Sequence, residues 1–567
     1  MENFTVSPLD IPLIVDIIRK NLSKQDIINC SIVNKQFYVL FKRWCWHSIR
    51  VKLCTIVNVN APFSIPLDEE FQKALLDNKN FLRELDIFES DEGELLKFIS
   101  NTLQPCSLTK LKYVIFRSLE DRRLQSPMDL IEMNTSLQYL NIRLGYEPHA
   151  KHFRARFISA LSNLPSLTTL KLWDNSVVHR NDYRALLERL PETLETFEIG
   201  WRVHRHSGPK ELGHFPDSGF RDVYPRLATL SLVTDIDLKY TRTILFPFLR
   251  RCPALEILRL EQSGGDKEGF FFFLADPALF PKLTSLNMSI HITPGFSDVI
   301  SGMKGRIKSF SYSGESALSA EAIANHWGST LEVLRIGPAS YIKSQEIELI
   351  LTRCTKLRVL IIYQKLYTME LSAYCAWSDN EYNHYSTNWN CLDLEHLELT
   401  FLDVRGTYEN NPYHRWTSGF NSSKVELYTF NGIQKICHQL GRLTKLRHLR
   451  LGWSTTKQVQ SDVSLDMSIK NGLTHLKDLR KLEVLDVTLI EHVNFKQEEV
   501  EWIAMNWPKL RRIKGLFNKN RPYSNWLSFE LGDDIDDEDE NPVKRDESCD
   551  PIPIQWLRRQ RPHLVIS

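Results

Sequence analysis

The sequence lacks an excess of charge of either sign, a membrane-length apolar run and a paired cysteine motif. Its 71 Lys and Arg residues balance 70 Asp and Glu, which removes the uniform positive field of a non-specific nucleic-acid binder. Charged residues interrupt the first thirty positions, where a signal peptide would be continuously apolar. The ten cysteines include no CxxC pair, so we expect reduced thiols that pack as small apolar groups. These absences predict a cytoplasmic or nuclear protein with no nucleic-acid and no membrane partner.

Motifs for catalysis are also missing. We find no phosphate-binding GxxxxGK[ST] loop, no GxGxxG after a strand, no GxSxG elbow and no HExxH. Two close histidine pairs, His149 with His152 and His204 with His206, have no Cys or carboxylate at metal-ligand spacing. We therefore assign no catalytic residue, no metal ligand and no cofactor, and we expect a protein that is not an enzyme.

The dominant positive feature is a repeated phrase between residues 80 and 515. An apolar residue is followed by two variable ones, a second apolar residue, one variable residue and a third apolar one. Fifteen copies occur, for instance at Leu227, Leu230 and Leu232, and most successive copies are spaced close to the roughly 20 to 29 residues of leucine-rich repeats. The alternation in the second half predicts a strand with one buried face, and segments such as 181–190 and 344–354 have helical spacing. The fold class is therefore α/β, a leucine-rich-repeat solenoid with parallel strands on the concave face and helices on the convex face.

The binding surface of such a solenoid is predicted from the variable residues that flank the last two apolar positions. Long interruptions near 200–222, 363–391, 400–430 and 452–470 begin directly after strand phrases, so we expect them on one rim. Two of them are rich in aromatic residues, which disordered loops carry rarely. Aromatic and Arg side chains dominate binding hot spots. The predicted substrate-binding residues are Trp173, Arg259, Arg335, Tyr363, Trp377, Glu398, Trp416 and Arg450.

The amino-terminal segment from residue 8 to 50 lies outside the repeat. It predicts three short helices, at 11–22, at 24–44 with a break near Val33, and at 44–49. Ser23 stands at an N-cap position, and Pro12 suits a first helical turn. The segment carries more apolar side chains than so small a bundle can bury, so part of this surface needs a partner. An amphipathic cap that covers the end of the solenoid is the alternative.

This segment resembles an F-box. Ile11 and Pro12 match its Leu-Pro, Leu22 and Ile27 its central apolar pair, and the "IVNKQF" run, which ends at Phe37, its "LVCKxW". An F-box followed by irregular "P-x-L-x-x-L-x-L" repeats is the layout of fungal F-box leucine-rich-repeat proteins. The resemblance implies docking on the Skp-family adaptor of a cullin-RING ubiquitin ligase, with the solenoid holding a protein substrate. The implied adaptor-binding residues are Ile11, Pro12, Ile14, Ile17, Leu22, Ile27, Ile28, Val33, Phe37 and Trp46.

The expected organisation has four parts. Residues 1–50 form the F-box-like helical motif, 51–80 a linker or capping segment, and 81–530 the solenoid with its insertions. Residues 531–567 form an acidic tail and a short terminal element that caps the array. The alternative function is a leucine-rich-repeat scaffold or signalling regulator with no role in ubiquitin transfer.

Overall fold

The computed structural model describes most of the repeat region and parts of both terminal segments. The described residues are 17–19, 21–53, 69–89, 107–115, 125–144, 151–178, 180–203, 223–234, 244–261, 268–276, 278–289, 296–314, 319–337, 340, 342, 344–367, 388–402, 434–454, 468–470, 472–489, 495–515 and 551–566. The chain divides into unit 1, residues 1–273 with 277–283, and unit 2, residues 274–276 with 284–567.

Unit 1 contains eight described strands that pair in chain order, each parallel to the next. The strands are β1 (Ser48–Leu53), β2 (Glu84–Glu89), β3 (Lys110–Ile115), β4 (Tyr139–Leu144), β5 (Thr169–Val178), β6 (Thr196–Val203), β7 (Thr229–Thr234) and β8 (Ile257–Glu261). The helices are α2 (Lys24–Ser31), α3 (Lys35–Cys45), α4 (Glu69–Asn78), η2 (Lys79–Phe81), α6 (Gln125–Met133), α7 (Lys151–Leu161), α8 (Arg180–Glu188), α10 (Phe246–Leu249) and most of α11 (Glu268–Ala275).

Unit 2 continues the same pattern with nine described parallel strands. They are β9 (Ser285–Ser289), β10 (Ser309–Tyr312), β11 (Val333–Ile336), β12 (Val359–Tyr367), β13 (His396–Leu402), β14 (His448–Ser454), β15 (Val484–Leu489), β16 (Arg512–Lys514) and β17 (Val565–Ile566). The helices include α12 (Phe296–Gly302), α13 (Ala320–Trp327), α14 (Ser344–Arg353), η8 (Leu473–Leu476), α17 (Gln497–Asn506) and α18 (Ile552–Gln560).

The repeated phrase explains why the strands form where they do. All fifteen predicted copies coincide with a strand, from β2 to β16. In β11, Leu334 and Ile336 are completely buried while Arg335 between them is exposed. The same alternation lets every strand bury one face, and the parallel pairings put these buried faces side by side. The prediction of an α/β array of parallel strands with helices is confirmed.

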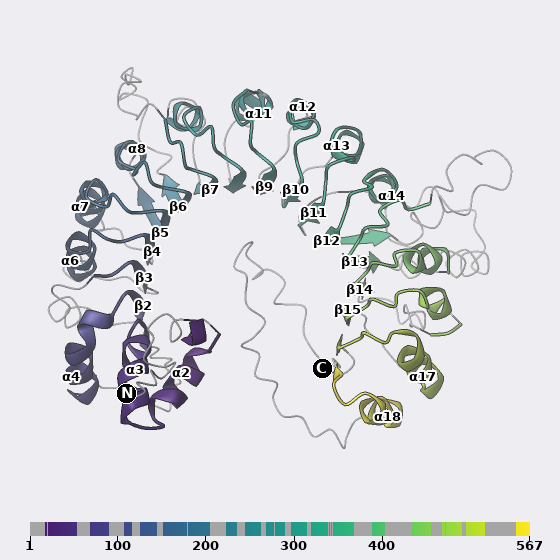
Figure 1. Ribbon diagram of the computed structural model, residues 1–567. Coiled ribbons are helices and arrows are strands. Elements are labelled where there is room, and N and C mark those ends of the chain that lie inside the picture. The colour runs from purple at the N-terminus through teal and green to yellow at the C-terminus, as the bar shows by residue number, and fades with distance from the viewer. Residues whose placement is uncertain are drawn as a thin grey trace, which may run out of the picture. The chain divides into compact units, whose positions relative to one another are not determined.

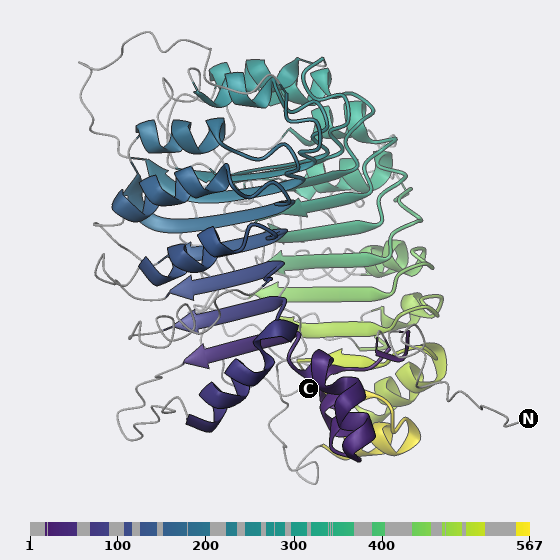
Figure 2. The ribbon, with the colours of Figure 1, turned by 60° about the vertical axis from the view of Figure 1, so that its left-hand side comes forward.

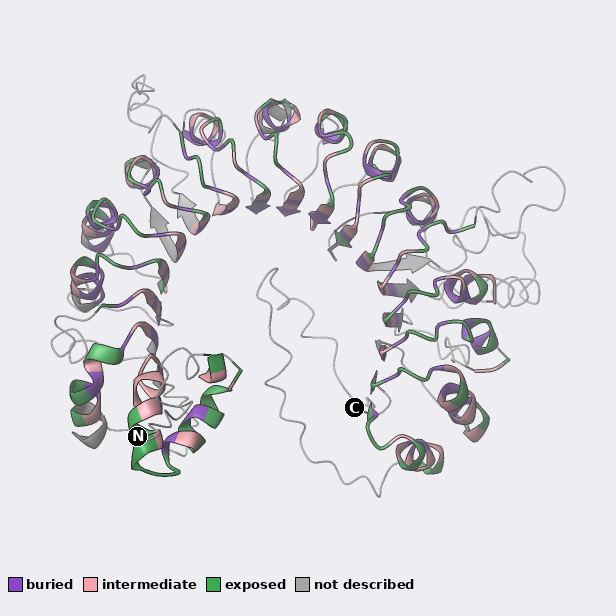
Figure 3. Ribbon diagram, in the orientation of Figure 1, coloured by how far each residue is buried: buried purple, intermediate pink, exposed green. Residues whose placement is uncertain are grey.

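The helices of each unit lie on one side of its strands. In unit 1, α6, α7 and α8 flank β3 to β6, and in unit 2, α12, α13 and α14 flank β10 to β12 (Figure 1). The arrows of neighbouring strands run side by side in the same direction (Figure 2). Buried residues gather where strands and helices face each other (Figure 3). The core of each unit is therefore the layer between its strands and its helices, and the other strand face lies outside this layer.

The amino-terminal helices follow local capping signals. Ser23 caps α2, its side chain accepting a hydrogen bond from the Asp26 backbone N–H in a reciprocal capping box. The predicted break near Val33 is confirmed, because Asn34 caps α3 through the Phe37 N–H at 2.9 Å. The predicted third helix at 44–49 is wrong: α3 continues to Cys45, and β1 begins at Ser48. The expected helix at 11–22 falls mostly outside the described residues.

Two kinds of boundary differ from the sequence expectation. Parallel pairing starts at β1, whose Ser48 is opposite Glu84 of β2, so the array begins before residue 81. The insertions after β6, β12, β13 and β14 begin a few residues later than predicted, because these strands are longer. At the other end, α18 leads into β17, which pairs with β16 as the expected closing element. Most of the acidic stretch lies outside the described residues.

Three of the cysteines lie in the core in front of strands. Cys252, Cys354 and Cys391 are fully buried in front of strands, where they pack as small apolar groups. Among the described helices, none has both the length and the apolar composition needed to cross a bilayer.

Candidate functional site

One row of side chains runs along the strand face that bears no phrase leucines. Each member directly follows the buried apolar residue in the middle of its phrase, and the parallel register places the members opposite one another. We call this the central row. In unit 1 it comprises Arg50, Asp86, Lys112, Asn141, Lys171, Glu198, Ser231 and Arg259. In unit 2 it comprises Asn287, Ser311, Arg335, Ile361, Glu398, Arg450, Asp486 and Lys514.

In unit 1 the central row pairs opposite charges on neighbouring strands. The Lys171 ammonium lies 3.1 Å from the Glu198 carboxylate, and Arg50 lies 3.5 Å from Asp86. Beside this row, the Trp173 ring covers Gly200, its register partner on β6. A Cβ at Gly200 would come within 2.4 Å of that ring, so glycine is what allows the indole to lie flat on the sheet. The ring of the predicted binding residue Trp173 therefore packs partly against the sheet.

In unit 2 five polar residues on three adjacent strands form a contiguous cluster. His396 and Glu398 come from β13, His448 and Arg450 from β14, and Asp486 from β15. The His396 Nε2 lies 2.7 Å from Glu398 Oε1, and Arg450 Nη1 donates to Glu398 Oε2 at 3.3 Å. Arg450 Nε lies 3.5 Å from Asp486 Oδ2. We call these five residues the β13–β15 cluster.

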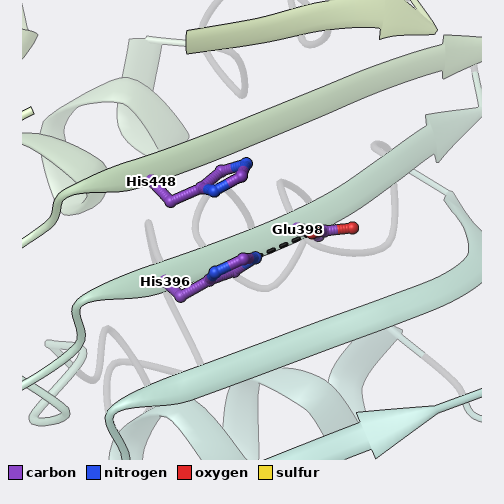
Figure 4. Close-up of side chains that lie close together, drawn as sticks. All are labelled: His396, Glu398 and His448. Atoms are coloured by element: carbon purple, nitrogen blue, oxygen red, sulfur yellow. Dashed lines mark hydrogen bonds and ion pairs between the residues drawn. The ribbon is translucent and has the colours of Figure 1, made fainter. Parts of the chain in front are cut away.

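The two histidine rings of the cluster stack on each other. Their centroids are 4.1 Å apart with an interplanar angle of 26°, because His396 and His448 are register partners on neighbouring strands. Both rings extend in the same direction along their strands, and the Glu398 carboxylate lies ahead of the His396 ring (Figure 4). One ring nitrogen of each histidine and one carboxylate oxygen of Glu398 all lie within 4.8 Å of one another. Within the described ranges, this is the one group of three such donors close enough to hold a metal ion.

Burial and charge set the protonation states of the cluster. Burial, with the neighbouring His396, lowers the pKa of His448 to about 4, so this imidazole is neutral at physiological pH. The Nε2 of His448 is shielded from solvent and has no hydrogen-bond partner. Burial acts to raise the pKa of Glu398, but the hydrogen bond with His396 and the charge of Arg450 more than offset it, and the pKa is lowered. Glu398 is therefore ionised.

A second candidate site lies on the two amino-terminal helices. Ile32 is 77% exposed and Val39 73% exposed, although both are aliphatic. On the same helices Ile27 and Phe41 are buried. We call the exposed set the N-terminal apolar surface, which consists of Ile17, Ile28, Ile32, Val33, Tyr38 and Val39.

The predicted adaptor-binding residues are distributed over three environments. Ile17, Ile28 and Val33 are exposed and belong to the N-terminal apolar surface. Leu22, Phe37, Trp46 and the fully buried Ile27 contribute instead to internal packing, wholly or in part. Ile11, Pro12 and Ile14 lie outside the described residues.

The predicted substrate-binding residues converge best in unit 2. Arg335, Glu398 and Arg450 share the central row, and the pKa of Tyr363 is raised by burial and by the nearby Glu398 charge. In unit 1, Arg259 is exposed on the central row. Trp377 and Trp416 lie outside the described residues.

Sequence reasoning missed His448 as a site residue, although a signal was present. His396 precedes the second apolar residue of its phrase, "LEHLEL", and His448 holds the same place in "LRHLRL". Equal phrase positions become register partners in a parallel array, so the two rings had to meet. The interruption between the phrases hides this adjacency in the linear sequence.

Comparison with known proteins assigns no family. The chain matches no protein-family model, and no curated protein matches it. The two surfaces described above are therefore the basis for a functional proposal.

Proposed function

We propose that the chain is the substrate-recognition subunit of a Skp-cullin-F-box type ubiquitin ligase. In this proposal α2 and α3 dock on a Skp-family adaptor, and the central row binds a protein substrate. The N-terminal apolar surface is the observation that carries the proposal. The chain itself needs no catalytic residue, because holding a substrate close to a transferring enzyme raises its effective concentration.

The exposure of Ile32 and Val39 argues for a partner. Removing one such aliphatic side chain from water is worth about 1.5 to 3 kcal/mol, so several together can support a stable interface. A helical cap would direct these side chains into the array. Here Ile27 and Phe41 are buried, and yet Ile32 and Val39 are left exposed to solvent.

The central row supports recognition of a protein substrate. Charges of both signs alternate along it, as in the Arg450 contacts with Glu398 and Asp486. Arrays of this kind favour a partner of complementary pattern and reject like charges. Tyr363 and Trp173 add aromatic surface beside the row, which is typical of binding hot spots.

A leucine-rich-repeat scaffold with no role in ubiquitin transfer is the alternative. Its support is the position of the helices: α3 is followed directly by β1, the first strand of the pairing in unit 1. The Lys24 Nζ also donates to the Ser48 carbonyl, tying α2 to β1. A terminal repeat needs such a cover, and α2 and α3 would provide it.

The test compares two exposed apolar positions of nearly equal exposure. Val39 on α3 is 73% exposed and Met505 on α17 is 74% exposed. In the full-length chain we expect Val39→Asp to weaken binding to a purified Skp-family adaptor at least about tenfold, and Met505→Asp to leave it unchanged. If the wild-type chain ignores the adaptor, the ligase proposal fails and the scaffold is preferred. Equal effects of the two substitutions would remove the N-terminal apolar surface as the docking site.

A further inference from the structure

We infer that His396, Glu398 and His448 form a binding site for one transition-metal ion of the zinc type. The proposal concerns unit 2 alone and is independent of adaptor binding. It begins from backbone register, because His396 and His448 face each other across two strands about 4.8 Å apart. Glu398 follows His396 by two residues and so projects from the same face of the sheet. Three donors from two rigid strands thus point to one place.

The chemistry of the donors selects the class of ion. Two imidazole nitrogens and one carboxylate oxygen form a set that Zn²⁺ binds in proteins, with a fourth position open to water or to a partner's ligand. Calcium and magnesium prefer sites made of oxygen atoms alone. The set therefore favours zinc, and cobalt(II) is a spectroscopic substitute for it.

The Nε2 of His448 is a second, independent indication. It is shielded from solvent and has no hydrogen-bond partner. A buried polar atom without a hydrogen-bond partner lowers the stability of the fold by about 1 to 3 kcal/mol, so each such atom in a native structure calls for an explanation, such as a bound ion. A metal ion bound to this nitrogen would satisfy it at the position where His396 and Glu398 already meet.

Neighbouring charged side chains contact Glu398 but leave its Oε1 directed at His396. Arg450 contacts Glu398 Oε2 at 3.3 Å, which leaves Oε1 directed at His396 Nε2 at 2.7 Å. Arg450 also pairs with Asp486, whose Oδ2 lies 3.5 Å from the Arg450 Nε. Such outer contacts orient a metal-binding carboxylate. Lys514 on β16 is the further cation that acts on His448.

Metal binding requires only side-chain movement. Bonds of about 2.0 to 2.1 Å to zinc place tetrahedral ligands about 3.3 Å apart. The three donor atoms lie within 4.8 Å of one another, so small rotations bring them to that separation. The hydrogen bond between His396 and Glu398 is then replaced by two bonds to the ion.

The experiment titrates the metal-free full-length chain with Zn²⁺ by calorimetry and with Co²⁺ by visible absorption. We expect His448→Gln and Glu398→Gln each to remove one bound equivalent, or to weaken it at least about tenfold, and to remove the tetrahedral Co²⁺ absorption. The matched control is His438→Gln, which alters another close histidine pair, His438 and His475, with ring centroids 5.9 Å apart. This control should bind as the wild type does.

Either of two results with the wild type and His448→Gln would overturn the site, and a third result concerns the control. One is a wild-type chain that binds no Zn²⁺ at micromolar concentrations, and the other is equal binding by the wild type and His448→Gln. Melting temperatures in chelator show whether each variant is folded, and His396→Gln replaces any that is not. Loss of the same equivalent in His438→Gln would likewise contradict the assignment, because it would place the ion elsewhere.

Discussion

The strand array and the amino-terminal helices differ in whether their apolar side chains are buried or exposed. In the array, phrase leucines such as Leu397 and Leu449 are completely buried, each between its strand neighbours and the helical layer. On α2 and α3, Ile32 and Val39 are more than two-thirds exposed. The array thus buries the apolar side chains of its phrases, whereas α2 and α3 leave several apolar side chains exposed to solvent. The difference separates residues that hold the fold from residues available to a partner.

The carboxyl-terminal element shows that an end of the array need not expose such a surface. Leu557 of α18 and Ile566 of β17 are buried, and Arg561 donates to the Trp507 carbonyl at 2.6 Å. Only single apolar residues such as Ile552 are left exposed on α18. An end can therefore be closed by one short helix and one short strand. The larger exposed set on α2 and α3 calls for another explanation, and the proposed adaptor docking would supply one.

The largest expected effect comes from a phrase leucine. Leu397→Ala leaves a cavity in the fully buried layer and should lower the free energy of unfolding by about 3 to 5 kcal/mol. Leu392, five positions earlier and 45% exposed, provides the matched control, with an expected loss of less than about 1 kcal/mol for Leu392→Ala. Denaturant unfolding measures both. Similar losses at the two positions would contradict the assigned orientation of β13.

A smaller effect tests whether the buried layer excludes charge. Burial raises the pKa of Glu348 on α14 from 4.5 to about 7, so the folded chain keeps its proton over a range where the unfolded chain has lost it. The contribution of Glu348 to stability is therefore fully present below pH 4.5. It is lost as pH rises through 7, by up to about 3 kcal/mol. Glu348→Gln should remove this loss and be more stable than the wild type at pH 8.

Melting temperatures between pH 5 and 8 check the Glu348 prediction. Glu321→Gln, at an exposed position of α13, is the control and should follow the wild-type pH dependence. If the wild type and Glu348→Gln had the same dependence of melting temperature on pH over this interval, the pKa of Glu348 would not be raised in the folded chain.

The fold was predictable from sequence wherever the repeated phrase is intact. Leu334, Arg335 and Ile336 illustrate why, since alternation alone decides which side chain enters the core. β1 was missed although Trp46, Ile49 and Val51 have the phrase spacing, because tryptophan stands in the leucine position and follows helical residues directly. A phrase recognised by spacing rather than by residue type would have included it.

The candidate site was predictable only in part, for a different reason. Arg335, Glu398 and Arg450 were found because each occupies the variable position of a phrase. The stacking of His396 on His448 depends on which strands are neighbours, and the residues between them obscure this in sequence. The lack of a partner for the His448 Nε2 depends on three-dimensional burial, which no local pattern encodes.

The smallest expected effect on stability is at the N-terminal apolar surface. Ile32 is 77% exposed, so Ile32→Ser should change the stability of α2 and α3 by no more than about 0.5 kcal/mol. Ile27 of α2 is 6% exposed, so Ile27→Ala should lower the stability of the same helices by about 2 to 4 kcal/mol. Hydrogen exchange of the amides in residues 24–45 measures both effects in the full-length chain. Equal deprotection by the two substitutions would mean that Ile32 is packed in the free chain, and a packed side chain is not available to an adaptor.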